Sequence, residues 1–405
     1  YRVAHMIEEL KVPAERILLL TFTNKAAGEM KERVKKLIGF EIGHAGTFHS
    51  FCARILRMYG TFIGLDQDFV IYDEDDKEQA IKMAMKEVGV DAKMFKTASL
   101  AGAISSAKNE MLSVIDYENF ARGPFQKKVV EVWRVYQRNM GKFHAVDFDD
   151  LLVKGVELLR NKEVQEKLKR RFVEVLIDEY QDTNKAQYLL TKLLVDGRNG
   201  LTVVGDFSQS IYSWRGADFR NLNYLINDFP TIKEIRLLKN YRSTQLILDA
   251  AFGVIGRNVS NPILKLTATG EEGQKILVYQ ARDEKDEARY ILEEIVNDGD
   301  FSKFAVLYRT NAQSRVLEEA FIRKGIPYVL VGGTKFYERR EIKDVLSYLK
   351  VIANPADEVS WERIEKVGKR RRAEFERWRE ETGRDHDLAK MKTEDSLRGA
   401  LKAAD

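Results

Sequence analysis

Two adjacent carboxylates, Asp178 and Glu179, follow an apolar run that is typical of a buried β-strand, Phe172–Ile177. In a parallel sheet, the carboxyl ends of the strands form the edge at which ligands bind. Phosphoryl transfer needs one carboxylate that holds Mg²⁺, usually through water, and a second group that orients the attacking water. Asp178 suits the first role and Glu179 the second, although a strand followed by an acidic helix start would give the same residues.

A second apolar run, Leu201–Gly205, leads into polar and aromatic residues. Gln209 could contact a terminal phosphate beside the two carboxylates. Tyr212 and Trp214 are two residues apart, so an extended segment places both on one side. Together with Arg215 they are a candidate platform for stacked bases, whereas Trp214 could instead fill a core.

A third polar segment, Leu238–Thr244, contains an arginine and a tyrosine that could also meet a nucleotide. Arg242, offered from a second domain, can neutralise the charge that develops on a γ-phosphate. Tyr241 could stack on a purine. On its own, the segment is typical of a strand-to-helix turn with a Ser or Thr cap.

The elements around these residues alternate between strands and helices, which is typical of a parallel α/β fold. We predict a first α/β domain over residues 1–65 and 145–232, with a helical insertion over 66–144. A second α/β domain is predicted over 233–355, and 356–405 form a charged, helix-like start of a further insertion.

Hydrophobic periodicity predicts individual elements in each part of the chain. In the first domain they are the strand Arg16–Phe22 and the helix Asn24–Leu37, and in the insertion the helices Lys77–Val88 and Gln126–Met140. In the second domain they are the helices Glu284–Asn297 and Ser314–Lys324 and the strands Glu234–Leu238, Lys275–Tyr279, Phe304–Tyr308 and Tyr328–Val331.

The composition is that of a soluble globular protein with more than one core, because 44% of the 405 residues are hydrophobic and 32% are charged. A net charge of +4 neither proves nor opposes a nucleic-acid partner. The single cysteine, Cys52, excludes an internal disulfide framework and fits a reducing cytoplasm. Since no apolar run approaches the roughly 20 residues that span a bilayer, we expect no membrane partner.

Several segments in order resemble the UvrD/Rep family of superfamily 1 DNA helicases. In the first domain they are Thr21–Ala27, Gly46–Phe51, Asp178–Asp182 and Gly205–Arg215. In the second domain they are Asn240–Thr244, Tyr308–Asn311 and Gly332–Glu341. Ordered motifs at compatible spacing are much more specific than any one short pattern.

The resemblance implies an ATP-driven motor that uses Mg²⁺, moves 3′ to 5′ along single-stranded DNA and unwinds duplex at single-strand/double-strand junctions, in DNA repair or replication. It implies two RecA-like domains of the P-loop NTPase type that close on ATP. The nucleotide residues that it implies are Asp178 and Glu179 for Mg²⁺ and water, Gln209 and Arg215 near the γ-phosphate, Arg242 as the trans-acting finger and Tyr241 as the adenine platform.

The resemblance also assigns residues to the DNA track. They are Phe22, Asn24, Lys25, Thr47, His49, Tyr212, Trp214, Arg309 and Asn311. Stacking on aromatic rings suits a motor, because every base has a π-face and the grip need not depend on sequence. His49 is equally compatible with a packed, hydrogen-bonded residue, and we expect Phe48 and Phe51 to be core residues.

Some parts of the family pattern are not found. The phosphate-binding loop, Gly-x-x-x-x-Gly-Lys-Ser/Thr, would precede the helix-like segment Tyr1–Leu10, and the motifs that close the second domain are also missing. The segment Gly368–Arg372 keeps one glycine of a turn that grips duplex DNA in many members, but not the turn itself. We therefore expect an internal fragment that cannot hydrolyse ATP alone.

Two alternatives stay open. The chain could belong to a helicase–nuclease, or it could be a non-catalytic DNA-binding module derived from a helicase. Retention of Asp178, Glu179, Gln209 and Arg242 together argues against the second alternative, because such a module has no need for all four.

Overall fold

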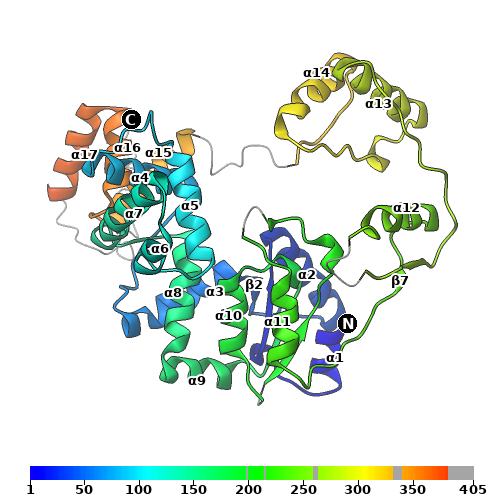
Figure 1. Cartoon of the computed structure of the whole chain (residues 1–405), viewed down its shortest axis with the longest axis horizontal. Coiled ribbons are helices and arrows are strands. Elements are labelled where there is room, and N and C mark those ends of the chain that lie inside the picture. The colour runs from blue at the N-terminus through cyan, green and yellow to red at the C-terminus, as the bar shows by residue number, and fades with distance from the viewer. Residues whose placement is uncertain (198, 214–215, 259–262, 332–339, 382–405) are drawn as a thin grey trace. The chain divides into compact units, whose positions relative to one another are not determined.

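A computed structural model describes the chain except for residues 198, 214–215, 259–262, 332–339 and 382–405 (Figure 1). The chain divides into two compact units. The first unit contains Tyr1–Ile235 and the segment from Arg340 onward, and the second contains Arg236–Val259 and Leu264–Arg339. Each unit is described by itself.

The first unit is built on a parallel four-stranded sheet. Its strands, in the order β2-β1-β5-β6, are β2 (Ala45–Thr47), β1 (Ile17–Thr21), β5 (Glu174–Ile177) and β6 (Gly200–Val203). Leu20 pairs with Ile177, which pairs with Val203, so β1, β5 and β6 end at the same edge. The predicted strand Arg16–Phe22 is confirmed as β1.

Strand β1 is buried along its whole length because helices cover both faces of the sheet. Ile17 and Leu19 face one cluster, which includes residues of helices α1 and α2. Leu18 and Leu20 face the opposite cluster, which includes residues of α3, α8 and α10. The seven helices of this region that the structure describes are α1 (Arg2–Glu8), α2 (Asn24–Ile38), α3 (Phe48–Tyr59), α8 (Phe148–Arg160), α9 (Lys162–Arg171), α10 (Lys185–Leu194) and α11 (Arg220–Asp228).

Local chemistry sets the ends of α2, which lies between β1 and β2. The Thr23 hydroxyl accepts the Ala26 N–H at 3.1 Å and so caps the helix, as Ser and Thr caps do. At the other end, Gly39 takes a left-handed conformation with a φ of 83°, which costs glycine little. The helix predicted over Asn24–Leu37 is confirmed to within one residue.

The predicted insertion is helical. Its helices are α4 (Glu74–Glu87), α5 (Thr97–Asn109), α6 (Val114–Phe120) and α7 (Pro124–Lys142), and the short strand β3 (Val70–Tyr72) pairs in parallel with β4 (Ala145–Asp147). The helices predicted over Lys77–Val88 and Gln126–Met140 are confirmed, although each begins slightly earlier. Asp73 forms a capping box before α4, and Pro124 occupies the first turn of α7.

A buried ion cluster joins α5 of the insertion to β4 and the start of α8. Lys108 Nζ lies 2.7 Å from Asp147 Oδ2 and 2.8 Å from Asp150 Oδ1, and the Tyr136 hydroxyl also donates to Asp147. Burial alone would lower the pKa of Lys108, but the two carboxylates outweigh it and raise this pKa above its usual value. The cluster therefore holds a charged lysine in the interior.

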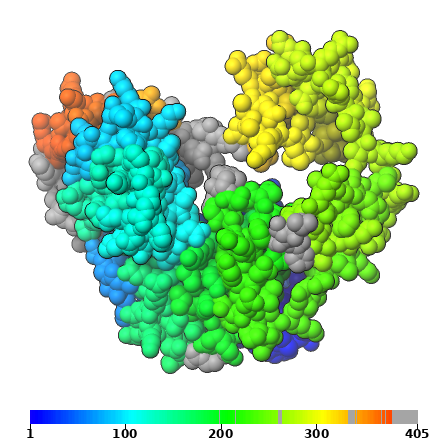
Figure 2. Space-filling view, viewed as in Figure 1, coloured from blue at the N-terminus to red at the C-terminus, as the bar shows by residue number. Residues whose placement is uncertain are grey.

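Three helices near the C-terminal end of the described chain pack on the insertion. They are α15 (Arg340–Ala353), α16 (Glu358–Val367) and α17 (Lys369–Glu381), and they adjoin the insertion in the space-filling view (Figure 2). Val359 enters the core of the insertion, the Tyr72 hydroxyl donates to Asp357 at 2.5 Å, and Lys343 pairs with Asp73 at 2.8 Å.

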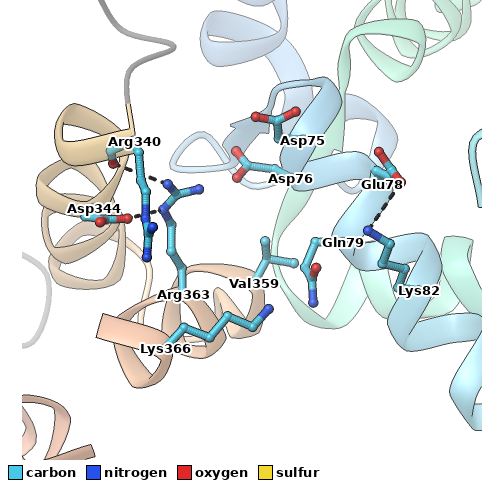
Figure 3. Close-up of a pocket in the computed structure, with 10 residues that line it drawn as sticks. All are labelled: Asp75, Asp76, Glu78, Gln79, Lys82, Arg340, Asp344, Val359, Arg363 and Lys366. Atoms are coloured by element: carbon cyan, nitrogen blue, oxygen red, sulfur yellow. Dashed lines mark hydrogen bonds and ion pairs between the residues drawn. The ribbon is translucent and has the colours of Figure 1, made fainter. Parts of the chain in front are cut away.

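A pocket of about 340 Å³ lies where α4 meets α15 and α16 (Figure 3). Side chains of both charges line it, and several of them pair with one another. Arg363 contacts Asp344 at 2.7 Å, and Lys82 contacts Glu78 at 3.2 Å. The pocket is therefore lined by ion pairs that largely neutralise one another.

The second unit has less regular structure than the sequence predicts. It contains α12 (Gln245–Ile255), α13 (Glu284–Asp298) and α14 (Ser314–Lys324), and α13 and α14 pack side by side (Figure 1). The helices predicted over Glu284–Asn297 and Ser314–Lys324 are confirmed. The strands that the structure describes here are the short parallel pair β7 (Lys239–Asn240) and β8 (Thr267–Ala268).

The four strands predicted for the second unit are wrong as stated. The structure has no strand over Glu234–Leu238, Lys275–Tyr279, Phe304–Tyr308 or Tyr328–Val331. An apolar run becomes a strand only where a neighbouring strand pairs with its N–H and C=O groups, and within the described residues these runs have no such partner. The predicted segment over 356–405 is helical as far as Glu381, and the rest lies outside the described residues.

Candidate active site

The two predicted catalytic carboxylates lie at the carboxyl edge of the sheet. Strand β5 ends at Ile177, and the next N–H, that of Asp178, donates to the carbonyl of Leu20 in β1 at 2.9 Å. The Glu179 N–H donates to Asp178 Oδ1 at 3.1 Å. The end of β1 therefore fixes the backbone of Asp178, and Asp178 in turn accepts a hydrogen bond from Glu179.

Glu179 has an unusual backbone conformation, with φ and ψ of 54° and 45° in the left-handed region. This conformation costs a residue with a side chain about 1–2 kcal/mol. It turns the chain sharply from β5 into the short 3₁₀ turn Tyr180–Asp182, and the Tyr180 N–H then donates to the Val204 carbonyl at 2.9 Å. Such strain is often retained at functional sites, where the surrounding structure enforces it.

The carboxylates at this edge repel one another. The pKa of Asp178 is raised by burial and then by the charge of Glu179. Burial and Glu179 also raise the pKa of Asp182 to about 6. A cation would relieve this repulsion, so the donor set fits Mg²⁺ held by one or two carboxylates together with water and phosphate oxygens. No described group of three or more His, Cys, Asp or Glu side chains is arranged as a protein-only metal site.

Gln209 lies on the loop that follows β6, at the same edge of the sheet. Its amide donates from Nε2 to Asp206 Oδ2 at 2.9 Å, and its side chain is exposed. Asp206 also caps the 3₁₀ turn Phe207–Gln209 by accepting the Ser208 N–H at 2.9 Å. The predicted phosphate-sensing amide is therefore held by a carboxylate and remains accessible to a ligand.

Among the predicted DNA-track residues of the first unit, the structure brings two aromatic rings together. The rings of Phe22 and Tyr212 lie 5.0 Å apart at an angle of 32°, although the two residues are far apart in the sequence. Asn24 and Lys25 are exposed in the first turn of α2. Trp214 and Arg215 lie outside the described residues.

Thr47 and His49 have structural roles in α3. The Thr47 hydroxyl accepts the Ser50 N–H at 3.2 Å and caps the helix. The His49 ring meets the Phe148 ring edge-on at 6.0 Å, and burial lowers the pKa of His49. These contacts support the alternative that His49 is a packed residue rather than a DNA contact. Phe48 and Phe51 are core residues, as expected, and Cys52 is fully buried among them.

The residues of the second unit that are predicted to bind nucleotide or DNA are exposed to solvent. Tyr241 and Arg242 follow β7, and the Asn240 side chain accepts the N–H groups of Arg242 and Ser243 at 2.9 and 2.8 Å. This Asx-type turn orients the segment. The other predicted DNA-track residues of this unit, Arg309 and Asn311, are also exposed.

A set of buried amide side chains, which the sequence patterns do not predict, lies next to the carboxylates. Gln181 touches Glu179 and the Asp206 backbone, and Asn221 donates to the Thr183 carbonyl at 2.7 Å. Asn184 caps α10 and donates to Asn109 of the insertion at 2.6 Å. The signal that could have found them was an amide residue inside or beside each motif, but apart from Glu179 the partners lie 25 to 75 positions away in the sequence.

Comparison with known families identifies two matching models. The model of the UvrD/REP helicase N-terminal domain matches residues 1–230, and that of the UvrD-like helicase C-terminal domain matches residues 235–390. The chain belongs to the UvrD/Rep helicase family. This agrees with the parallel α/β sheet and the helical insertion of the first unit, and the predicted fold class is therefore confirmed.

Similar proteins include the ATP-dependent DNA helicases PcrA of two staphylococci. The chain is 45% identical to the Staphylococcus aureus protein and 46% identical to that of Staphylococcus epidermidis, each over 377 residues. The matches cover 91% of this chain and 52% of each relative, so the chain spans about half the length of these relatives. None of the helices that the structure describes is both long and apolar enough to cross a membrane.

Proposed function

We propose that this member of the UvrD/Rep family works as part of an ATP-dependent DNA helicase that moves 3′ to 5′ on single-stranded DNA. The observation that supports this most strongly is the pair Asp178 and Glu179 at the carboxyl end of β5, beside the loop that bears Gln209. That edge is where parallel α/β sheets bind ligands. The relatives named ATP-dependent DNA helicases agree with this choice.

In this proposal the carboxylates divide the work of ATP hydrolysis. Asp178 would hold Mg²⁺, and Glu179 would accept a hydrogen bond from the attacking water and so orient it. Mg²⁺, when bound, neutralises charge on the phosphate oxygens. Gln209 and Arg215 contact the γ-phosphate, Arg242 stabilises the charge that develops on it, and Tyr241 stacks on the adenine.

The DNA track in this proposal uses aromatic stacking and phosphate contacts. Phe22 and Tyr212, whose rings touch, form a stacking surface for bases, and Trp214 also stacks on DNA, while Asn24 and Lys25 meet phosphates. Arg309 and Asn311 contribute from the second unit. Thr47 and His49 act by shaping the start of α3, with His49 packed on Phe148.

We also propose the domain assignment of this family. Residues 1–65 and 145–232 form the first RecA-like domain, 66–144 its insertion, 233–355 the second RecA-like domain and 356–405 the start of its insertion. The protein acts in the cytoplasm, on single-strand/double-strand junctions, in DNA repair or replication. Because this sequence contains no phosphate-binding loop, we expect no DNA-stimulated ATP turnover from the 405 residues alone.

Strand displacement by the full-length protein tests the proposed function. We expect ATP-dependent unwinding of a duplex with a 3′ single-stranded tail, and little unwinding of a matched duplex with a 5′ tail. A blunt duplex and a reaction without Mg²⁺ serve as controls. Preferential unwinding of the 5′-tailed duplex, or unwinding without ATP, would contradict the proposal.

A further inference from the structure

The side chain of Gln181 connects the loop after β5 to the loop after β6. Its Nε2 donates to Glu179 Oε2 at 2.8 Å, and its Oε1 accepts the Asp206 N–H at 3.0 Å. The same Nε2 lies 3.5 Å from Asp182 Oδ2. A side-chain amide can donate to a carboxylate and accept from a backbone N–H at the same time, which a carboxylate or a hydrocarbon cannot do.

The space around Gln181 is closed. Its exposed fraction is 1%, and a Cβ at position 205 would lie 3.0 Å from Gln181 Oε1 and 3.4 Å from its backbone N. Gly205 therefore allows the two loops to approach closely. The Ser210 hydroxyl donates to the Gln181 carbonyl at 3.3 Å, which adds a further link between the loops.

Gln181 is one member of a continuous hydrogen-bonded chain. Glu179 accepts from Gln181, Gln181 accepts from the Asp206 backbone, and the Asp206 carboxylate accepts from Gln209 Nε2 at 2.9 Å. One end of the chain is the carboxylate proposed to orient water, and the other is the amide proposed to contact the γ-phosphate. Both ends reach exposed positions, whereas Gln181 itself is buried.

We propose that Gln181 is a positioning residue that fixes the Glu179 carboxylate relative to the Gln209 loop, so that a change at the γ-phosphate reaches the group that orients water. This inference rests on the proposed function of Glu179 and Gln209. It assigns Gln181 no contact with ATP, DNA or Mg²⁺. A Gln181 variant should therefore lower the rate of the chemical step more than it changes nucleotide or DNA affinity.

Two substitutions in the full-length protein test the inference. For Gln181→Ala we expect kcat for ATP hydrolysis to fall about 10- to 100-fold, with KM for ATP changed less than about threefold. For Gln181→Glu, which keeps the shape of the side chain but replaces the donor with a carboxylate oxygen, we expect a similar loss of kcat at pH 8. A purely structural role would lower the fraction of folded enzyme and leave kcat per folded molecule unchanged, whereas we expect kcat per folded molecule to fall in both variants.

Gln187→Ala is the matched control. Gln187 is also a buried amide of this region, with an exposed fraction of 3%, but it closes the capping box of α10 and has no contact with Glu179 or Asp206 in the described structure. We expect this variant to lower the melting temperature while the ATPase rate per folded molecule stays within about twofold. A Gln181 variant that behaves like Gln187→Ala would overturn the inference.

Hydrogen exchange of the Asp206 amide in this chain gives a readout that does not depend on ATPase activity. We expect Gln181→Ala to speed this exchange at least about tenfold, while the Leu19 amide in β1 is unchanged. If the wild-type protein shows no ATPase, the proposed function fails, and the exchange result alone decides whether the bridge exists. If wild-type ATPase is present and both Gln181 variants keep kcat per folded molecule, only the inference fails.

Discussion

Both units of this chain contain apolar runs that predict β-strands. In the first unit such runs form a parallel sheet, whereas in the second unit the predicted runs do not. In the first unit all five residues of β1 are buried, and β1 pairs with both β2 and β5. In the second unit, apolar residues of the predicted strands are open to solvent, with exposed fractions of 92% for Leu307 and 88% for Val278 and Val329. The difference shows that an apolar run specifies a strand only together with its partners.

The two units also differ in how their helices bury apolar side chains. Helices cover both faces of the first sheet, whereas the described residues of the second unit form one small cluster of buried apolar side chains where α13 packs on α14, made of Leu292, Ile295, Phe321 and Ile326. None of the described residues of α12 is buried. We therefore expect the first unit to contribute most of the resistance of this chain to unfolding.

The largest expected difference between the units is the loss of unfolding free energy when a lysine is removed from an ion pair. Lys108→Met leaves Asp147 and Asp150 buried without their cation, and we expect the first unit to lose about 3–5 kcal/mol of unfolding free energy. In the second unit, Lys303→Met breaks an exposed pair with Asp298, and we expect a change of about 0–1 kcal/mol. Urea denaturation measures both, and equal losses would refute the contrast between the units.

Hydrogen exchange can sharpen the comparison at the level of single strands. The Leu19 amide donates to the His44 carbonyl at 2.8 Å within a buried strand, whereas Leu307 lies in no helix or strand. We expect the Leu307 amide to exchange at least about 100-fold faster, since backbone groups outside a ladder are open to water. Comparable protection of residues 304–308 would show that the predicted strand forms after all.

The smallest expected effect is a pH dependence of opposite sign in the two units. In the first unit the pKa of Asp182 is raised from 3.8 to about 6, so its ionisation costs stability progressively as the pH rises from about 4 to about 6, and Asp182→Asn should stabilise more at pH 7.5 than at pH 4. In the second unit, hydrogen bonds from the Arg282 N–H and Arg289 lower the pKa of Asp286 to about 2.

The Asp286 carboxylate therefore contributes stability above about pH 4, and this contribution is lost as the pH falls toward 2. Asp286→Asn should accordingly destabilise at neutral pH and have less effect in acid. Melting temperatures across this range measure both variants, and an effect of the same sign in both units at pH 7.5 would contradict the assigned causes.

The sequence could predict features that depend on neighbours in the chain. The boundaries of α2 and α14 follow from caps and periodicity, and the position of Asp178 and Glu179 follows from the strand before them. The contacts of Lys108 with Asp147 and of Gln181 with Asp206 could not be predicted, because these partners are 39 and 25 positions away and a lone lysine or glutamine is usually exposed. Burial of such residues depends on tertiary packing.

ATP hydrolysis by the full-length protein with Glu179→Gln tests the central claim most directly. We expect kcat to fall at least about 100-fold while binding of nucleotide and single-stranded DNA is retained, because an amide orients the attacking water poorly. Glu174→Gln, the same change at the other end of β5, is the matched control and should keep kcat within about twofold. A Glu179→Gln protein with the wild-type rate would contradict the role proposed for this carboxylate.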